Sequence, residues 1–330
     1  MSVDRLHHLS TDTGLLLALA SAASFGTSGS FATSLLAAGW TPGAAVAARL
    51  LIAALVLAVP AVRLIRSRPG QLRSGWPTVV LYGLVPVAGC QLCYFEAVQH
   101  LSVAVALLLE YSGALLVVGW MWLRHHQVPT GVTGAGAAVA VAGLAMVLDL
   151  FGHQHLSAVG VLWGLGAAVG LAVYFVVSAR QREDSLPPLV VAWGGMATGA
   201  VAMGVFGLVG ALPMRDPRHS VVLDHLHVSW LVPLLGIGVV AAAFAYVTGI
   251  AAARALGARL ASFVGLAEVL FATLYAWLLL GQRLTYPQLV GAALVVAGIA
   301  LVRLGEPAPA PAPAEAAIRT SAPVPAQAAI

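Results

Sequence analysis

Three carboxyl groups lie inside stretches of the chain that are otherwise apolar. Glu110 occurs within LLLEYSGALL (107–116), and Glu96 and Glu268 occupy comparable stretches. An acid that faces lipid costs several kcal/mol or loses its charge, so acids in membrane helices usually face the protein interior and carry function. Because burial favours the protonated form of a carboxyl group, we predict that Glu110 and Glu268 line a cavity and bind substrate or couple transport to protons. The alternative is a structural role, in which each protonated Glu hydrogen-bonds a neighbouring helix.

Arg49 is the only arginine well inside an apolar stretch. A buried arginine pairs with an anion or extends along apolar surface toward water. We therefore predict that Arg49 binds a substrate carboxylate, pairs with Glu96 or acts in a gate. Glu96 lies near the end of its stretch beside Gln99 and His100, so a hydrated position is the alternative to a binding role.

Aromatic side chains in the apolar stretches are the remaining candidates for substrate contact. Packing and anchoring at the membrane surface are the commoner uses of such residues, and that alternative stays open. The set predicted to bind substrate or to support coupling comprises Glu110, Glu268, Arg49, Glu96, Tyr94, Tyr111, Trp163, Tyr174, Tyr246 and Tyr275.

Other motifs of chemical interest are weaker. Cys90 and Cys93 have the C-x-x-C spacing of redox sites, but on an apolar helix they share one face and are predicted to pack. The stretches HQH (153–155) and DHLH (224–227) fall in connections and are predicted to be solvated. The chain contains no Lys, so the lysine of a phosphate-binding glycine-rich loop is excluded. We predict no metal, no cofactor and no nucleic-acid partner.

The elements that must position these residues are membrane helices. The chain is 60% hydrophobic and 8% charged, with a mean hydropathy of +0.95, whereas a soluble domain has about a quarter charged residues. A membrane helix needs about 20 mostly apolar residues. Ten such runs occur, at 14–37, 42–63, 76–99, 101–122, 131–149, 158–179, 188–212, 230–252, 260–280 and 286–304.

Arginine placement predicts the orientation, because connections on the cytoplasmic side are enriched in positive charge. Twelve of the 16 arginines fall on one side of the ten runs and three on the other. This predicts that both termini are cytoplasmic. The alternating Pro and Ala near the C-terminus predict a disordered tail. The predicted units are a cytoplasmic segment 1–13, a first repeat 14–149, a second repeat 157–305 and a cytoplasmic tail 306–330.

An internal repeat indicates how the ten helices are arranged. The segments 136–147 and 291–302 match at eight of twelve positions, at an offset of 155 residues. This offset pairs the fifth run with the tenth, so each unit has five helices and the second must be inverted relative to the first. The fold class is therefore an all-α polytopic membrane protein with ten transmembrane helices in two inverted five-helix repeats, an architecture that places substrate sites near the bilayer midplane.

The repeat also relates the two central acids. Glu110 aligns with Gly265, and Gly113 aligns with Glu268, so the two halves carry the same residue types exchanged by one turn. Each Glu lies about eight residues into its run, or about 12 Å, in a hydrocarbon core about 30 Å thick. The sequence thus predicts two carboxyl groups near one midplane cavity.

The chain resembles EamA-type members of the drug/metabolite transporter superfamily. The resemblance rests on ALLLEYSGALLVVGWMWL (106–123) and on the stretch from ASFVGLAEVLF to GAALVVAGIALV (261–302), and it covers about residues 14–304. Many members have a proline just after the LEY turn, where this chain has Ser112, Gly113 and Ala114. The resemblance implies export of amino acids, related metabolites or drugs across a bacterial inner membrane, by alternating access, driven by the substrate gradient or by protons.

Two other functions are alternatives to a transporter. A membrane-embedded enzyme acting on a lipid or small precursor would need acids, bases or metal ligands clustered at an interface, whereas the acids here are dispersed at midplane depth. A structural or sensory subunit is a third reading. The favoured prediction is a non-enzymatic transporter whose partners are a small-molecule substrate and the lipid bilayer, and the sequence leaves open whether two copies form a homodimer.

Overall fold

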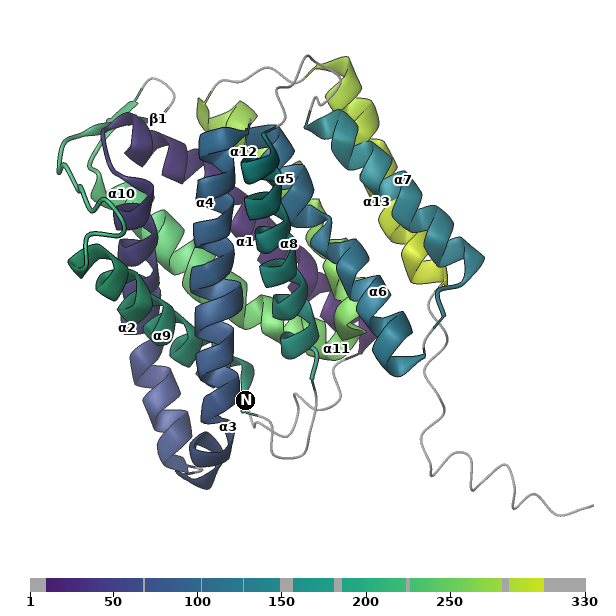
Figure 1. Cartoon of the computed structure of the whole chain (residues 1–330), viewed down its shortest axis with the longest axis horizontal. Helices are drawn as coiled ribbons and strands as arrows, with labels where there is room; N and C mark the ends of the chain where they lie inside the picture. Colours follow the sequence, from purple (N-terminus) through teal and green to yellow (C-terminus); the bar gives the residue numbers. More distant parts are fainter. Residues whose placement is uncertain are drawn as a thin grey trace, which may run out of the picture.

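The computed structural model describes residues 10–67, 69–101, 103–126, 128–148, 157–180, 186–223, 226–280 and 285–305. In these residues the fold is helical except for one short hairpin (Figure 1). The predicted tail 306–330, most of the segment 1–13 and the HQH stretch lie outside the described residues.

Helices follow the predicted apolar runs closely, but several runs are divided. In chain order the elements are α1 (Thr11–Ala37), α2 (Pro42–Ser67), α3 (Pro69–Tyr82), η2 (Gly83–Gly89), α4 (Cys90–His100), α5 (Val103–Tyr111), α6 (Gly113–His125), α7 (Gly131–Val147), α8 (Ala158–Ser178), α9 (Pro188–Leu208), β1 (Val221–Leu223), β2 (Leu226–Val228), α10 (Leu231–Leu235), η3 (Gly236–Phe244), α11 (Ala245–Gly265), α12 (Ala267–Leu280) and α13 (Tyr286–Gly305).

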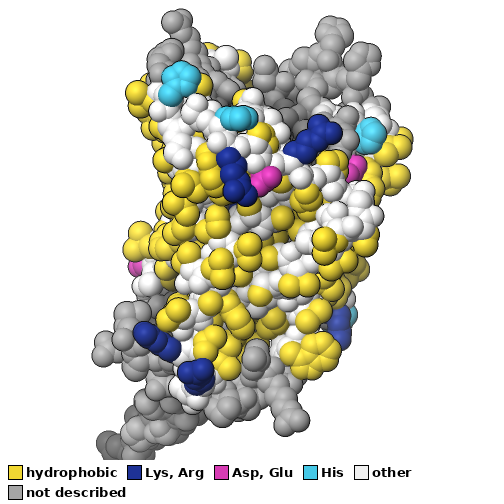
Figure 2. Space-filling model, turned by 90° about the vertical axis from the view of Figure 1, so that its left-hand side faces the viewer, with side chains coloured by type: hydrophobic (Ala, Val, Ile, Leu, Met, Phe, Trp, Pro, Cys, Tyr) yellow, Lys and Arg dark blue, Asp and Glu magenta, His cyan; other side chains and the backbone are white. Residues whose placement is uncertain are grey.

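The helices have the length and composition of membrane spans. Among the described residues, eight helical segments are long and apolar enough to cross a bilayer. Two shorter apolar helices, Gly131–Val147 and Ala267–Leu279, coincide with the other two predicted runs. Figure 2 shows hydrophobic side chains across the middle of one face, with arginine side chains gathered toward its two ends. This surface suits a protein that passes through the bilayer several times.

Two of the divided runs, each predicted as a single helix, are broken at one residue. The run 101–122 breaks at Ser112, between α5 and α6, and the run 260–280 breaks at Leu266, between α11 and α12. A 3₁₀-type backbone hydrogen bond lies at each break. Leu115 N–H donates to the Ser112 carbonyl at 2.9 Å, and Leu266 N–H donates to the Phe263 carbonyl at 3.1 Å. The Ser112 hydroxyl also donates to the Leu109 carbonyl at 2.5 Å. Such side-chain bonds compete with the helical ladder, so the interruption occurs here without proline.

Two π-helical segments occur at matching places in the repeat. The 155-residue offset moves Gly83, the start of η2, onto Gly238 within η3. Each glycine lies close to a helix from the other half. A Cβ at Gly83 would meet Thr198 of α9, and a Cβ at Gly238 would meet Ile52 of α2. Pro86 lies within η2, where the wider turns of the π-helix accommodate the missing proline N–H.

Helices α7 and α13, which carry the repeat motif, pack side by side (Figure 1). The Thr130 hydroxyl, at the start of α7, donates to the carbonyl of Gly305 at the end of α13 at 3.2 Å. At the other end, the Gln288 amide donates to the Val147 carbonyl at 3.3 Å. The start of one helix thus meets the end of the other, so the pair is antiparallel.

Helix α11 includes the predicted connection between the runs 230–252 and 260–280. Arg254 and Arg259 lie in that connection, on either side of Gly257, where two helical stretches meet at a kink. Gly257 has φ 78° and ψ 162°, a conformation that a residue with a Cβ rarely adopts, and it kinks the helix. Arg259 is 4% exposed, and Arg254 donates to the Leu186 carbonyl at 2.6 Å. These two arginines are therefore part of the packed bundle.

The connection between α9 and α10 folds over the turn between α1 and α2. It includes the β1–β2 hairpin, whose Val221 is 1% exposed. The Thr41 hydroxyl donates to the Pro213 carbonyl at 2.7 Å, and the Trp40 indole donates to the Pro217 carbonyl at 2.8 Å. The sequence analysis did not anticipate this hairpin, because three-residue strands carry almost no periodic signal.

Candidate functional site

A large cavity lies between the two parts of the chain that the repeat relates. Its volume is about 710 Å³, which is the size of a small-molecule site. The first part contributes residues of α1, α2, η2, α4, α5 and α7, and the second contributes residues of α8, η3, α11, α12 and α13. Both helix breaks lie beside it, because Glu110, Tyr111 and Glu268 are lining residues.

The cavity brings together most of the predicted site residues. Those that line it are Glu110, Glu268, Arg49, Tyr94, Tyr111, Tyr174 and Tyr246. Glu96, Trp163 and Tyr275 are not among its lining residues. Trp163 is 38% exposed on the bundle surface, and Tyr275 stacks on Phe271 with ring centroids 6.4 Å apart. For these three residues, a role in substrate contact remains a prediction from sequence.

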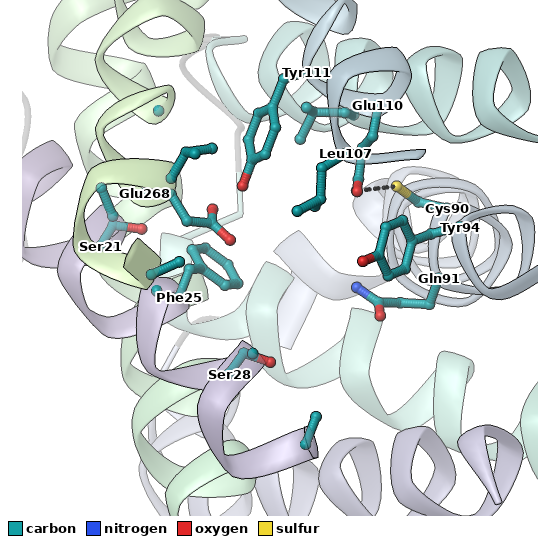
Figure 3. Close-up of a pocket in the computed structure, with 18 of the residues that line it drawn as sticks. Ser21, Phe25, Ser28, Cys90, Gln91, Tyr94, Leu107, Glu110, Tyr111 and Glu268 are labelled. Atoms are coloured by element: carbon teal, nitrogen blue, oxygen red, sulfur yellow. Dashed lines mark hydrogen bonds between the residues drawn. The ribbon is translucent and has the colours of Figure 1, made fainter. Parts of the chain in front are cut away.

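The two central carboxyl groups point into the cavity from opposite sides (Figure 3). Glu110 lies in the last turn of α5, just before the break at Ser112, and Glu268 lies in the first turn of α12, just after the break at Leu266. In Figure 3, the side chain of Leu107 and the ring of Tyr111 project between the two acids, and the Tyr111 hydroxyl points toward Glu268. The breaks therefore present both acids to the same space.

Cys90 is a contact of Glu110 that the sequence analysis missed. Its thiol lies 3.4 Å from Glu110 Oε1 and 3.3 Å from the carbonyl oxygen of Ala167 in α8. Cys90 is 4% exposed and lines the cavity. The prediction that Cys90 merely packs is therefore incomplete. A thiol has one proton, so it donates either to the carboxyl group or to the α8 backbone.

Gln91 and Tyr94 extend the polar side of the cavity below Cys90. Both project from α4, with the Tyr94 hydroxyl and the Gln91 amide pointing into the open space in Figure 3. Gln91 was missed as well. The signal that could have found it is its position three residues before Tyr94, which places both side chains on one face of the helix.

Arg49 supplies positive charge to the cavity and is 6% exposed. Its Nη1 lies 3.4 Å from the hydroxyl of Ser28 on α1, and its Nη2 donates to the carbonyl of Ala241 in η3 at 3.3 Å. Within the described residues, the ion pairs are Arg218–Asp216 and Arg303–Asp12, so Arg49 has no acidic partner there. The predicted alternative of an Arg49–Glu96 pair is not formed.

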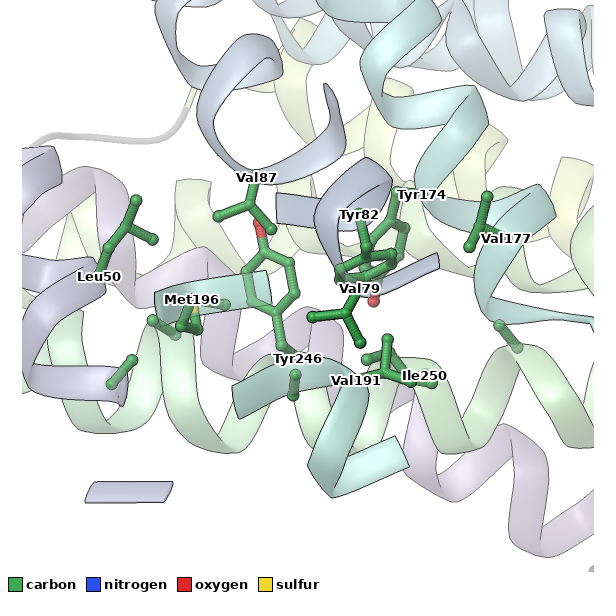
Figure 4. Close-up of a cluster of buried hydrophobic side chains, with 14 of the residues drawn as sticks. Leu50, Val79, Tyr82, Val87, Tyr174, Val177, Val191, Met196, Tyr246 and Ile250 are labelled. Carbon is green, nitrogen blue, oxygen red and sulfur yellow. The ribbon is translucent and has the colours of Figure 1, made fainter. Parts of the chain in front are cut away.

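One wall of the cavity is aromatic. Tyr174 and Tyr246 line it, and their ring centroids lie 5.6 Å apart in an edge-to-face arrangement. Behind them the fully buried Tyr82 packs on both rings, at 5.9 Å and 6.3 Å (Figure 4). Phe25 of α1 adds an edge-to-face contact to Tyr246 at 5.0 Å. This cluster closes the cavity toward the buried core.

The cavity offers polar, charged and aromatic groups but no metal cage. Among the described residues, no group of three or more His, Cys, Asp or Glu side chains is arranged to hold a metal ion. The arrangement instead suits reversible binding of a small molecule that carries polar groups.

The solved structures include one with the same overall fold. A crystal structure superposes with a TM-score of 0.72 at 21% identity, covering 88% of this chain and 97% of the other. The curated relatives have names that include the word transporter. The protein named "Uncharacterized transporter YwfM" from Bacillus subtilis is 26% identical over 69% of this chain and 73% of its own length.

Other relatives are similar in name and extent. The "Uncharacterized inner membrane transporter YicL" of Salmonella typhimurium is 23% identical over 69% of this chain and 73% of its own length. An "Uncharacterized transporter" of Archaeoglobus fulgidus is 26% identical over 63% of this chain and 70% of its own. The model of the EamA-like transporter family matches residues 12–149 and again residues 158–304. The chain, a multi-pass membrane protein, therefore belongs to the EamA-like transporter family.

Proposed function

We propose that this transporter exports small metabolites, such as amino acids or drug-like compounds, by proton-coupled alternating access. The observation that carries the proposal is the position of Glu110 and Glu268, which face one cavity of about 710 Å³ from opposite sides. Acids in membrane helices usually mark a transport path or a proton relay. The inner membrane of a bacterium is the proposed location, in keeping with the name of the Salmonella relative.

The proposed scaffold is ten membrane helices in two inverted repeats, 14–149 and 157–305. Three features support it. The matched helices α7 and α13 are antiparallel, the matched segments η2 and η3 are both π-helical, and the breaks at Ser112 and Leu266 differ by one residue from the repeat offset. Inverted repeats can exchange conformations, so such a scaffold gives two states that open on opposite sides.

The cavity extends toward one end of the bundle. The lining residues that lie nearest this end are Thr33, Leu36, Pro42, Leu148 and Gln288, at the connections α1–α2 and α7–α8 and at the start of α13. With both termini in the cytoplasm, as the arginine distribution predicts, this end faces outward. The structure then corresponds to an outward-facing state, and the aromatic wall of Tyr82, Tyr174 and Tyr246 lies on its closed side.

Proton coupling follows from the cost of charge in a closed cavity. A protonated carboxyl group tolerates a dry environment, whereas a carboxylate needs water or a cation. In this scheme Glu110 and Glu268 accept protons from the outward-facing cavity and release them inward, while substrate moves out. The other lining residues, among them Arg49, Tyr94 and Tyr246, contact the substrate.

Transport in proteoliposomes tests this proposal. Candidate substrates come from metabolites that accumulate in the medium of overexpressing cells and are depleted in the medium of deleted cells. With an imposed pH gradient, we expect Glu110→Gln and Glu268→Gln each to lower the gradient-driven flux by about tenfold or more. A tenfold change corresponds to a free-energy difference of ~1.4 kcal/mol. The control is Asp216→Asn, which changes an exposed acid outside the cavity lining. Gradient-driven flux that survives both central substitutions would exclude coupling through these acids.

A further inference from the structure

Arg49 has unused binding capacity inside the cavity. A guanidinium group has five N–H donors, and two of its nitrogen atoms have the acceptors Ser28 and Ala241, both at more than 3.2 Å. The third nitrogen, Nε, is buried and has no hydrogen-bond partner. Arg49 is 94% buried, since it is only 6% exposed, and it lines the cavity. A buried N–H group without an acceptor is unfavourable, and a ligand bound in the cavity would supply acceptors to this guanidinium.

The groups around Arg49 do not neutralise its charge. Its acceptors are a hydroxyl and a backbone carbonyl, and it has no ion pair within the part of the chain that the structure describes. Leaving a buried charge without a counter-ion is costly, whereas a well-oriented anion compensates it. The two acids that share the cavity lie on α5 and α12 and form no ion pair with Arg49, although their charges interact with it across the cavity.

We propose that Arg49, with the Ser28 hydroxyl, forms an anion subsite that binds the carboxylate of the transported molecule. The inference rests on the proposed function and adds a chemical class of substrate to it. Guanidinium binds carboxylate through two parallel N–H bonds, and the two Nη groups of Arg49, whose present bonds are 3.4 Å and 3.3 Å long, form such a pair of donors. A monoanion suits the site better than a phosphate dianion, because the same cavity holds two acids and one arginine.

The body of the ligand is defined by the adjoining aromatic side chains. Phe25 and Tyr246 line the cavity together with Arg49 and contact each other edge to face. Apolar and aromatic surface of this kind binds a hydrocarbon or ring, while a few polar groups fix its orientation. The preferred ligand is therefore a small carboxylate attached to an apolar or aromatic body.

A binding experiment on the full-length protein in lipid nanodiscs tests the subsite. The probe is 4-fluorobenzoate, followed by fluorine saturation-transfer NMR, and the neutral comparison is 4-fluorobenzyl alcohol. We expect 4-fluorobenzoate to bind at least about tenfold more tightly than the alcohol, equivalent to ~1.4 kcal/mol. Arg49→Gln should abolish this preference, Arg49→Lys should reduce it because one ammonium cannot form the paired bonds, and Ser28→Ala should weaken binding several-fold.

The controls separate a ligand-binding arginine from a structural one. Arg63→Gln removes an exposed arginine from the same helix and should leave binding unchanged. If Arg49→Gln does not give a monodisperse protein, Arg49→Lys and Ser28→Ala carry the test. Absence of 4-fluorobenzoate binding, or equal binding by the alcohol or by Arg49→Gln, would overturn the proposal, and stronger competition by inorganic phosphate than by acetate would overturn its carboxylate assignment. Binding is measured without a gradient, so its failure is distinguishable from failure of proton-coupled transport.

Discussion

The two halves of the molecule share a backbone plan but present different side chains to the cavity. Three pairs of repeat-related positions all line it, namely Gln91 with Tyr246, Tyr94 with Gly249, and Glu110 with Gly265. In two of these pairs, a large polar side chain in the first half corresponds to glycine in the second. Arg49 likewise corresponds by helix position to the neighbourhood of Gly194 and Gly195.

The space left by each glycine is filled by a side chain from another helix. At Gly249 a Cβ would meet the hydroxyl groups of Tyr174 and Ser21, and at Gly265 a Cβ would meet the Phe175 ring. In the proposed transport cycle the related halves support two conformations, while the unequal side chains give the cavity one set of binding groups rather than two. This separation implies that changes at the symmetric contacts affect folding, whereas changes at the unequal positions affect the cavity.

The largest expected effect concerns the most symmetric contact, between α7 and α13. A Cβ at Gly143 would lie 2.7 Å from the Gly291 carbonyl oxygen, and a Cβ at Gly291 would lie 2.7 Å from the Gly143 carbonyl oxygen. Gly143→Leu should therefore separate the helices and destabilise the protein by about 1–3 kcal/mol or more. Thermal unfolding in detergent measures the change.

The control for that substitution lies on the same helix. Gly134 has open space around its position, with no atom within 4 Å of an added Cβ. Gly134→Leu should leave the unfolding temperature nearly unchanged. Equal destabilisation by the two substitutions would show that bulk on α7, rather than the close contact with α13, is responsible.

A smaller effect is expected where the halves differ. Gly249→Ala places a methyl group against the Tyr174 and Ser21 hydroxyls, so Tyr174 must shift within the aromatic wall. We expect a loss of about 1–2 kcal/mol in stability, together with weaker binding of aromatic probes. Gly29→Ala is the matched control, because Gly29 also lines the cavity but has no atom within 4 Å of an added Cβ. Similar losses in both variants would contradict the assigned role of the Tyr174 contact.

The smallest expected effect concerns Cys90, whose repeat-related residue is Ala245. Cys90→Ala makes the halves alike at this position and removes the thiol contacts to Glu110 and Ala167. The expected loss in stability for Cys90→Ala is about 0.5–1.5 kcal/mol. Cys90→Ser should lose less stability than Cys90→Ala, because serine also donates a hydrogen bond. Cys93→Ala removes a thiol that does not line the cavity and is the comparison. If serine and alanine behave identically at position 90, the hydrogen bonds are not what the thiol contributes.

The sequence predicted the positions of the helices well because apolar length is a local property. It did not predict the breaks at Ser112 and Leu266, since each occurs inside an uninterrupted apolar run. It also assigned Cys90 to packing, because the neighbours of a side chain on other helices leave no periodic signal. The predicted connection at Arg254 and Arg259 contains the kink at Gly257, but the sequence did not show that Arg259 is buried or that Arg254 bonds the Leu186 carbonyl.

What the sequence alone determined is the membrane class, the match at an offset of 155 residues and the presence of acids and an arginine inside apolar runs. These features depend on residue type and spacing, which are read along the chain. Only the tertiary structure decided that Glu110, Glu268 and Arg49 share one cavity while Glu96, Trp163 and Tyr275 lie outside its lining. Which side chains meet depends on helix rotation and crossing, and these are determined by close packing between residues far apart in the chain.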